Sequence, residues 1–321
     1  MEKSFRMELA GRSLIVETGK MAKQASGAVL VRYGETVVLV TSTASKEARE
    51  GMDFFPLTVD YEEKMYAVGK MPGGFLRREG RPGNSAILNA RLIDRPIRPL
   101  FDKRCRNDIH VMATVLSVDY DNAPELCGML GASASLGISD IPWDGPIAGV
   151  RVGCVDGQFV INPTQEQLKV STLNITVAGS ETAILMVEGG AQEAPEEDVL
   201  DAIMFGHETI KELVAFQKKI IEEVGKSKRT LIFPEIPEEI KNAIYAYAER
   251  PLKEAIFNPD KLTREAHMEE VRKEAEAHFK EIYPENGSDI AECLNHLTKE
   301  IVRHMISVDK IRPDGRALDE I

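Results

Sequence analysis

A basic segment around residue 75 contains the residue types best suited to chemistry on a ligand. The chain has a formal net charge of −12 at pH 7, yet residues 64–106 hold eleven Lys or Arg against three Asp or Glu. The segment includes two glycines, two apolar residues and two arginines in a row: Gly73, Gly74, Phe75, Leu76, Arg77 and Arg78. Because glycine is conformationally permissive, we expect this run to form a loop tip. Such a tip can stack a nucleobase on its apolar side chains and hold a phosphate with its arginines.

Three further arginines follow at the spacing of a helical face. We expect a short helix that begins at Asn84 or Ser85, either of which can cap it, and that ends near Asp94. Pro96 favours this end, because proline lacks a backbone N–H and restricts the residue before it. If the helical turn persists that far, three guanidinium groups lie near one another: Arg91, Arg95 and Arg98. Forked guanidinium groups on one face suit phosphate oxygens, so these residues are candidates for binding RNA or phosphate.

A solvated basic surface is the alternative explanation of this segment. Runs of charge usually decorate surfaces. Some of the arginines could pair with Glu79, Asp94 or Asp102. In that case they stabilise the fold and contact no ligand.

The elements on either side of the basic segment predict an α+β fold. Residues 13–41 alternate in the manner of strands, and Gly34 and Glu35 form a two-residue connection typical of a hairpin. Residues 108–120 have the pattern of another strand, and residues 127–137 are small and apolar like a buried helix. Strands mixed with helices in this order indicate an α+β core.

A second group of hairpins follows this core. The chain turns at residues 156–157 and again at residues 179–180, each time between two apolar runs. From residue 195 to residue 225, apolar residues recur at helical spacing between a proline and a glycine. We expect this long helix to pack on the second sheet, and we expect the basic residues 226–229 to form a short linker.

The last third of the sequence changes to a purely helical period. Residues 235–305 contain three apolar stripes at helical spacing and no strand pattern, which predicts an all-helical domain. We expect residues 1–228 to form the first domain. Residues 306–321 are too short to fold by themselves and are expected to be the truncated start of another domain.

Composition and cysteine spacing exclude several classes of protein. Hydrophobic residues make up 43% and charged residues 29%, which is the balance of a globular protein and of neither a fibre nor a disordered chain. The N-terminus lacks the apolar core of a signal peptide, and no stretch reaches the roughly 20 apolar residues that cross a bilayer. The dispersed cysteines and histidines indicate neither a disulfide framework nor a zinc site. We therefore expect a cytoplasmic protein that has no membrane partner.

Three stretches of the sequence resemble the first RNase PH-like core of the bacterial polynucleotide phosphorylases. They are residues 53–59 (DFFPLTV), 74–82 (GFLRREGRP) and 90–101 (ARLIDRPIRPLF). Residues 312–316 (RPDGR) resemble the opening of the second RNase PH-like core of the same family. The resemblance covers nearly the whole chain and implies an RNase PH-like core followed by a helical linker domain.

The resemblance also implies a reaction and its partners. These phosphorylases use inorganic phosphate as co-substrate to degrade single-stranded RNA from its 3′ end to nucleoside diphosphates, reversibly and with the help of Mg²⁺. They assemble as homotrimers and can join RNA-degradation complexes. By resemblance, the loop of Phe75, Leu76, Arg77 and Arg78 narrows the central channel, and these four residues and Arg81 are the candidates for binding RNA.

The catalytic residues of the family lie in its second core, and the resemblance places none of them up to Ile321. Residues 123–125 (APE) stand where the second core has phosphate-holding serines. At the places of its two aspartates and its lysine, this chain has Leu168, Asn174 and Thr176. Leucine cannot ligate a metal, and neutral Asn and Thr are poor ligands for Mg²⁺. We therefore expect a catalytically silent first core, with the catalytic residues and the Mg²⁺ site beyond Ile321.

A non-catalytic RNA-binding protein is the alternative function. The same fold and the same channel residues could serve as a ring or scaffold component of an RNA-degrading complex. The sequence beyond Ile321 distinguishes the two functions, because a core with the Ser, Asp and Lys set indicates the enzyme.

Overall fold

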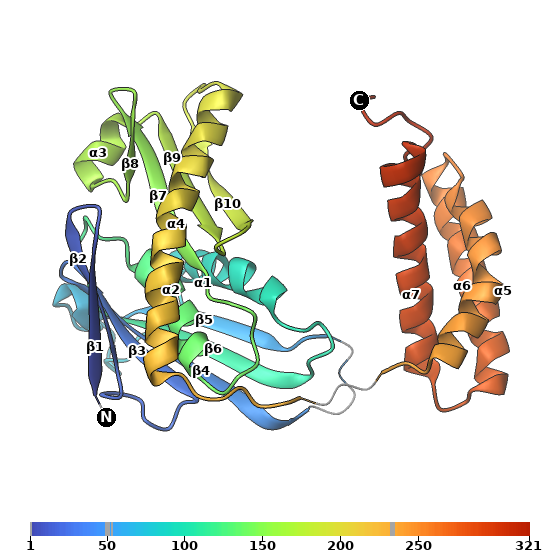
Figure 1. Cartoon of the computed structure of the whole chain (residues 1–321), viewed down its shortest axis with the longest axis horizontal. Coiled ribbons are helices and arrows are strands. Elements are labelled where there is room, and N and C mark those ends of the chain that lie inside the picture. Colours follow the sequence, from blue (N-terminus) through green and yellow to red (C-terminus); the bar gives the residue numbers. More distant parts are fainter. Residues whose placement is uncertain (1, 49–51, 53, 232–234) are drawn as a thin grey trace. The chain divides into compact units, whose positions relative to one another are not determined.

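The computed structural model describes residues 2–48, 52, 54–231 and 235–321, and the structural statements below concern these residues. The chain divides into two compact units, Met1–Ile232 and Phe233–Ile321, which are described separately. The first unit combines sheets and helices, and the second consists of helices (Figure 1). The predicted α+β core followed by an all-α region is therefore confirmed. No helix in the described part of the chain is both long and apolar enough to span a membrane.

A six-stranded sheet forms the base of the first unit. Its strands stand in the order β1-β2-β3-β4-β6-β5, and their bounds are β1 (Lys3–Leu9), β2 (Arg12–Thr18), β3 (Gly27–Tyr33), β4 (Thr36–Ala48), β5 (Leu57–Glu63) and β6 (Asn107–Ser117). Neighbours are antiparallel except for β5 and β6, which are parallel. A parallel pair needs a long crossover connection, and this crossover contains the basic segment.

The hairpin predicted at Gly34 and Glu35 is confirmed. Tyr33 pairs with Thr36, so the two residues form the whole connection between β3 and β4. Gly34 has a φ of +56°, and a Cβ atom there would lie 2.4 Å from the side-chain nitrogen of Asn122. Glycine is required at this position for both reasons.

Helix α2 (Pro124–Ile138) is the predicted buried helix, and it lies between the two sheets (Figure 1). All of its residues from Leu126 onward are buried. Its small residues permit close approach, since a Cβ on Gly131 would lie 2.4 Å from the side chain of Val40 in β4. On the other side, Met129 lies against Gly149 of the second sheet.

Helix α1 (Asn84–Ile97) begins where it was predicted, but its cap and its C-terminal end differ from the prediction. The N-cap residue is Gly83, with no side-chain cap from Asn84 or Ser85. The helix continues through Pro96 to Ile97 and leads directly into the short helix η2 (Arg98–Leu100). Pro96 and Ile97 are both buried. Their burial offsets the lost hydrogen bond and the steric cost of a proline inside the helix.

The second sheet has four antiparallel strands in the order β10-β9-β7-β8. Their bounds are β7 (Ala148–Val155), β8 (Gln158–Ile161), β9 (Leu173–Gly179) and β10 (Ile184–Ala191), and α3 (Gln165–Val170) connects β8 to β9. The turns at residues 156–157 and 180–183 confirm the two predicted hairpins. Helix α4 (Glu196–Val224) begins after Pro195 and ends at Gly225 as predicted. A Cβ on its Gly206 would lie 2.9 Å from Val152, so this helix packs on the second sheet.

Residues 226–229, expected to be a linker, are tied to the first unit. The ammonium group of Lys228 donates hydrogen bonds to the carbonyl oxygens of Leu136, Gly137 and Ser139, at 2.7, 3.0 and 2.8 Å. Arg229 pairs with Asp140 at 2.8 Å. The last carbonyl groups of a helix have no partner within it, so Lys228 caps the C-terminus of α2.

We expect Lys228→Met to lower the free energy of unfolding of the first unit by about 2 kcal/mol, because three carbonyl groups lose a charged donor. The measurement is urea denaturation followed by the fluorescence of Trp143, which is the one tryptophan of the chain and is buried in this unit. Lys219→Met, a change on the exposed face of α4, is the matched control and should shift stability by less than about 0.5 kcal/mol. Equal effects of the two substitutions would contradict a capping role.

Three helices build the second unit: α5 (Glu238–Ile256), α6 (Lys261–Ile282) and α7 (Gly287–His304). The three predicted apolar stripes meet in one core, which includes Ile244, Leu252, Phe279, Leu294 and Leu297. The stripes are therefore explained by packing between the helices.

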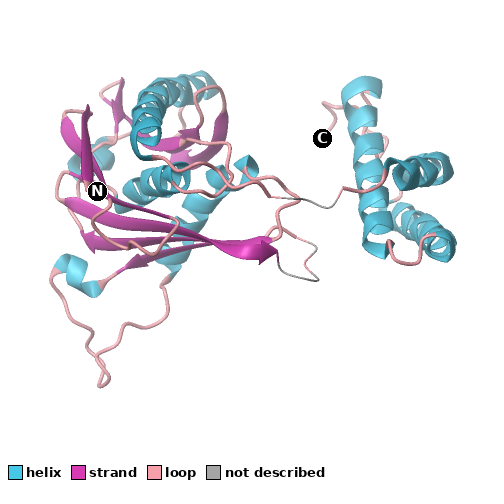
Figure 2. Ribbon diagram, turned by 60° about the horizontal axis from the view of Figure 1, so that its bottom comes forward, coloured by secondary structure: helices cyan, strands magenta, loops and turns pink. Residues whose placement is uncertain are grey.

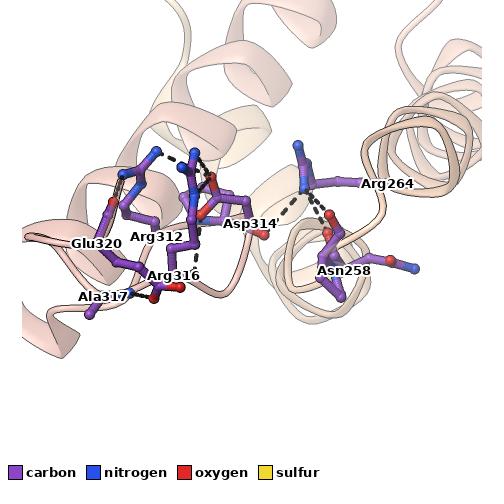
Figure 3. A network of polar contacts seen from close by, with 9 residues as sticks. Asn258, Arg264, Arg312, Asp314, Arg316, Ala317 and Glu320 are labelled. Carbon is purple, nitrogen blue, oxygen red and sulfur yellow. Dashed lines mark hydrogen bonds and ion pairs between the residues drawn. The ribbon is translucent and has the colours of Figure 1, made fainter.

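The residues after α7 are held by a polar network (Figure 3). After the short helix η3 (Met305–Asp309), Asp314 accepts hydrogen bonds from Arg312 and Arg316. The hydrogen bond from Arg316 lowers the pKa of Asp314 to about 2. Arg264 of α6 donates to the carbonyl oxygen of Pro313 at 3.3 Å. This network connects the C-terminal segment to the helical unit.

Candidate RNA-binding surface

The basic segment lies in the crossover from β5 to β6. After β5 the chain forms the short helix η1 (Met65–Val68), leaves it at Gly69, and returns at Gly83 to begin α1. Figure 2 shows this connection as a long loop that projects from the sheet between η1 and α1. The sheet thus carries the loop at its edge strand β5.

The tip of the loop presents apolar side chains to solvent. Phe75 is 101% exposed and Leu76 is 73% exposed. The N–H of Arg77 donates to the carbonyl oxygen of Gly74 at 2.9 Å, and Arg77 has a φ of +47°. This tight turn reverses the chain and leaves Phe75 and Leu76 at its corner. Neither side chain contributes burial to the fold, so both are available to a ligand.

Three arginines of the loop are free to bind anions. The guanidinium groups of Arg77, Arg78 and Arg81 are exposed and have no hydrogen-bond or ion-pair partner among residues 2–48, 52, 54–231 and 235–321. The sequence left open whether these charges pair within the protein. In this loop they do not.

A cavity of about 470 Å³ lies at the base of the loop, where Arg78 and Arg81 line it together with three glutamates. Each glutamate already has a partner: Glu62 pairs with Lys64, Glu63 accepts a hydrogen bond from Tyr61, and Glu79 accepts one from Met65. The hydrogen bond to Glu62 raises the pKa of Lys64, which keeps this ammonium group charged. The formal charges of the lining therefore balance, with three carboxylates against Lys64, Arg78 and Arg81, and the two arginines are the lining cations that have no partner in the described part of the chain.

The three arginines of the predicted helical face, Arg91, Arg95 and Arg98, differ in their partners in the structure. Arg98 makes two hydrogen bonds to Asp94, at 2.8 and 2.6 Å, and one to the carbonyl oxygen of Leu57. Arg95 pairs with Glu188 of β10. Arg91 is exposed and has no partner in the described ranges. A cavity of about 320 Å³ between β5 and α1 is lined by Arg91 and Arg98, but Arg95 does not reach it.

An ion pair occupies the place where the resemblance puts phosphate-holding serines. Glu125, in the first turn of α2, lies 2.6 Å from Arg151 of β7, and the two side chains are only 13% and 20% exposed. Thr176 stands opposite Arg151 in the sheet and is buried, Asn174 is exposed on the same strand, and Leu168 lies in α3. These residues offer a phosphate one carboxylate and no unpaired cation.

Three family models match successive parts of the chain. Residues 10–142 match domain 1 of the 3′ exoribonuclease family, and residues 145–209 match its domain 2. Residues 239–317 match a model described as the RNA binding domain of polyribonucleotide nucleotidyltransferase. The curated polyribonucleotide nucleotidyltransferases of Heliobacterium modesticaldum and Syntrophomonas wolfei each share 57% sequence identity with the chain, over 99% of its length.

The chain belongs to the polyribonucleotide nucleotidyltransferase family. It corresponds to the N-terminal portion of these relatives and spans 45% of the length of each. The crystal structure of rice (Oryza sativa) Rrp46 covers 69% of the chain with a TM-score of 0.51 and 14% identity, and 94% of that structure is matched. This likeness confirms the RNase PH-like fold.

The residues that the resemblance puts at the metal positions of the family do not fit Mg²⁺. Leu168, Asn174 and Thr176 provide no carboxylate, and the described residues contain no group of three His, Cys, Asp or Glu side chains that could hold a metal ion. Mg²⁺ prefers carboxylate and phosphate oxygens in octahedral geometry. These three residues are therefore unsuited to holding Mg²⁺.

The RNA-binding domain model of the polyribonucleotide nucleotidyltransferase family matches a region in which sequence reasoning predicted only packing. The apolar stripes of α5, α6 and α7 form the core of the helical unit and contain no information about a ligand. To predict RNA binding by this region, the sequence would have to be read for the polar residues on the exposed faces of these helices.

Proposed function

We propose that the chain provides RNA-binding surfaces of a phosphate-dependent 3′-to-5′ exoribonuclease, which degrades single-stranded RNA to nucleoside diphosphates. The observation that supports this most directly is the loop of residues 69–83, with a fully exposed Phe75 at its tip and three unpaired arginines beside it. The family assignment supports RNA as the ligand, and the role of this loop in binding it is part of the proposal.

The residues of the loop suit a single strand of any sequence. Every base has a π face, so stacking on Phe75 tolerates all bases and contributes about 1–3 kcal/mol per base. Arg77, Arg78 and Arg81 neutralise phosphates, which also carry no sequence information. Leu76 extends the apolar surface of the tip. In this proposal Arg91 adds a further phosphate contact beside the cavity between β5 and α1, while Arg95 and Arg98 keep their ion pairs and shape that surface.

The remaining parts of the proposal concern the whole protein. Residues 1–228 act as a first RNase PH-like core and residues 235–305 as a helical domain that also contacts RNA, while residues 306–321 begin a second core. Inorganic phosphate is the co-substrate, and Mg²⁺ and the catalytic residues belong to the part of the relatives that these 321 residues do not span. The protein assembles as a homotrimer around an RNA channel and acts in the cytoplasm, where it can join an RNA-degradation complex.

Replacement of both tip arginines tests the proposal. We expect Arg77→Ala combined with Arg78→Ala to weaken binding of single-stranded RNA about equally for all sequences, because only phosphate contacts are lost. The slope of log affinity against log salt should become flatter by about 0.7 for each lost contact. Fluorescence anisotropy with labelled oligoribonucleotides over a range of salt concentrations measures both quantities.

The matched control removes two lysines of α4, which lies outside the loop: Lys211→Ala with Lys219→Ala. These changes lower the net charge equally, so the control corrects for the long-range attraction of RNA. If the loop variant and the control variant have the same affinity and the same salt slope, the loop does not bind RNA.

A non-catalytic scaffold is the second candidate function, and the ion pair of Glu125 with Arg151 is consistent with it, because it leaves the first core without a free cation at the place that the resemblance gives to phosphate. The intact protein separates the two functions. Phosphate-dependent release of nucleoside diphosphates from RNA supports the enzyme, and RNA binding without release supports the scaffold.

A further inference from the structure

Glu79 is the one acidic residue between Lys64 and Ile93, and its carboxylate is used inside the protein. One carboxylate oxygen accepts a hydrogen bond from the backbone N–H of Met65 at 2.9 Å. The other lies 3.8 Å from the ammonium group of Lys64. The side chain of Glu79 is 29% exposed to solvent. Glu79 is therefore turned toward the first turn of η1, although it lies in a loop whose charges otherwise face solvent.

Helix η1, which Glu79 contacts, is itself joined to the sheet. The first N–H groups of a helix need acceptors from outside it, and the N-cap residue Lys64 provides no side-chain acceptor. Glu79 supplies one from the far end of the loop. The helix is in turn joined to the end of β6, because the N–H of Val118 donates to the carbonyl oxygen of Ala67 at 3.3 Å.

The Glu79 contact is the polar connection of the loop to the rest of the unit. Within the described ranges, residues 71–82 make one hydrogen bond to a residue outside the loop, and it is the bond that Glu79 accepts from the N–H of Met65. The neighbours of Glu79 on either side are the functional ones, with Arg78 before it and Arg81 two residues after it. Both line the cavity at the base of the loop.

We propose that Glu79 is a positioning residue, which ties the returning half of the loop to η1 so that Arg78 and Arg81 face one cavity. This inference rests on the proposed function, because it concerns how the loop presents its cations to RNA. A carboxylate close to a phosphate weakens binding by repulsion. The charge of Glu79 and its positioning role therefore have opposite effects on RNA affinity, and the sign of a mutational effect distinguishes them.

Two substitutions separate charge from position in the intact protein. We expect Glu79→Ala to lower affinity for single-stranded RNA about threefold to tenfold, since an unanchored loop must be ordered when RNA binds. Glu79→Gln retains an oxygen that accepts the N–H of Met65 and removes the negative charge, so its affinity should equal or exceed that of the wild type. Asp201→Ala, which removes an exposed acid of α4 outside the loop and both cavities, is the control and should not lower the affinity.

Hydrogen exchange gives a readout that does not depend on RNA. The amide of Met65 should exchange faster in Glu79→Ala than in the wild type, and protection should return in Glu79→Gln. Unchanged exchange in Glu79→Ala overturns the proposal, as does an RNA affinity at or above the wild type. A Glu79→Gln variant that loses as much affinity as Glu79→Ala also overturns it. If the wild type itself fails to bind RNA, the proposed function fails, and the exchange data then show separately whether the anchor exists.

Discussion

The 321-residue chain, incubated with single-stranded RNA, inorganic phosphate and Mg²⁺, is expected to release no nucleoside diphosphates. Phosphoryl transfer depends on positioning and on neutralising the charge of the transferred group with metal ions and cations. Leu168, Asn174 and Thr176 stand at the places that the resemblance gives to the family's acids and lysine, and Glu125 presents a carboxylate at the place that it gives to phosphate. Loss of a single stabilising donor already costs about 10²–10³ in kcat, so loss of the whole set should bring the rate below detection.

The measurement is chromatography of the nucleotides formed from a labelled oligoribonucleotide. RNA binding is measured on the same sample, so that an unfolded preparation is not mistaken for an inactive one. The intact protein under the same conditions is the positive control. Metal-dependent release of nucleoside diphosphates by the 321 residues, abolished by Glu125→Gln or by Thr176→Val, would show that the first core is the catalytic one.

The elements that sequence patterns predicted correctly are those whose pattern is set by neighbouring residues. Gly34 defines its hairpin because the turn itself demands a positive φ, and the helix between Pro195 and Gly225 carries its own start and stop signals. The stripes of the helical unit are local as well, because a period of 3.6 residues is read within a few turns. For such elements the sequence alone was sufficient.

The errors arose where distant residues decide the structure. α1 continues past Asp94 because Pro96 and Ile97 are buried, and burial is not visible in a run of charged residues. Arg95 pairs with Glu188, which is 93 positions away in the sequence, and Lys228 donates hydrogen bonds to carbonyl groups about 90 positions away. Proximity in the sequence suggested the pair of Arg98 with Asp94 as an alternative, and that pair is present. The exposed loop tip was predictable because its turn is closed locally, by the hydrogen bond from the N–H of Arg77 to the carbonyl oxygen of Gly74.

Arg151→Met is expected to destabilise the first unit by about 3 kcal/mol. The substitution leaves the carboxylate of Glu125, which is only 13% exposed, without its partner at 2.6 Å. A buried charge whose partner is removed typically costs 3–5 kcal/mol. We expect the lower end of this range, because both side chains keep some contact with water and because Nε of Arg151 has no hydrogen-bond partner in the described structure. Urea denaturation with the fluorescence of Trp143 reports on this unit.

The double variant Glu125→Leu with Arg151→Met decides whether the loss comes from the unpaired charge. Replacing both members of a buried ion pair by apolar residues is often neutral or stabilising, so the double variant should recover most of the stability that Arg151→Met loses. Lys218→Met, which breaks the exposed pair with Glu181, should change stability by less than about 1 kcal/mol. If Arg151→Met is as mild as Lys218→Met, then Glu125 is adequately hydrated without its partner. Its carboxylate would then be accessible to ions from solvent. The ion pair with Arg151 would then not prevent a metal ion from binding to the first core at Glu125.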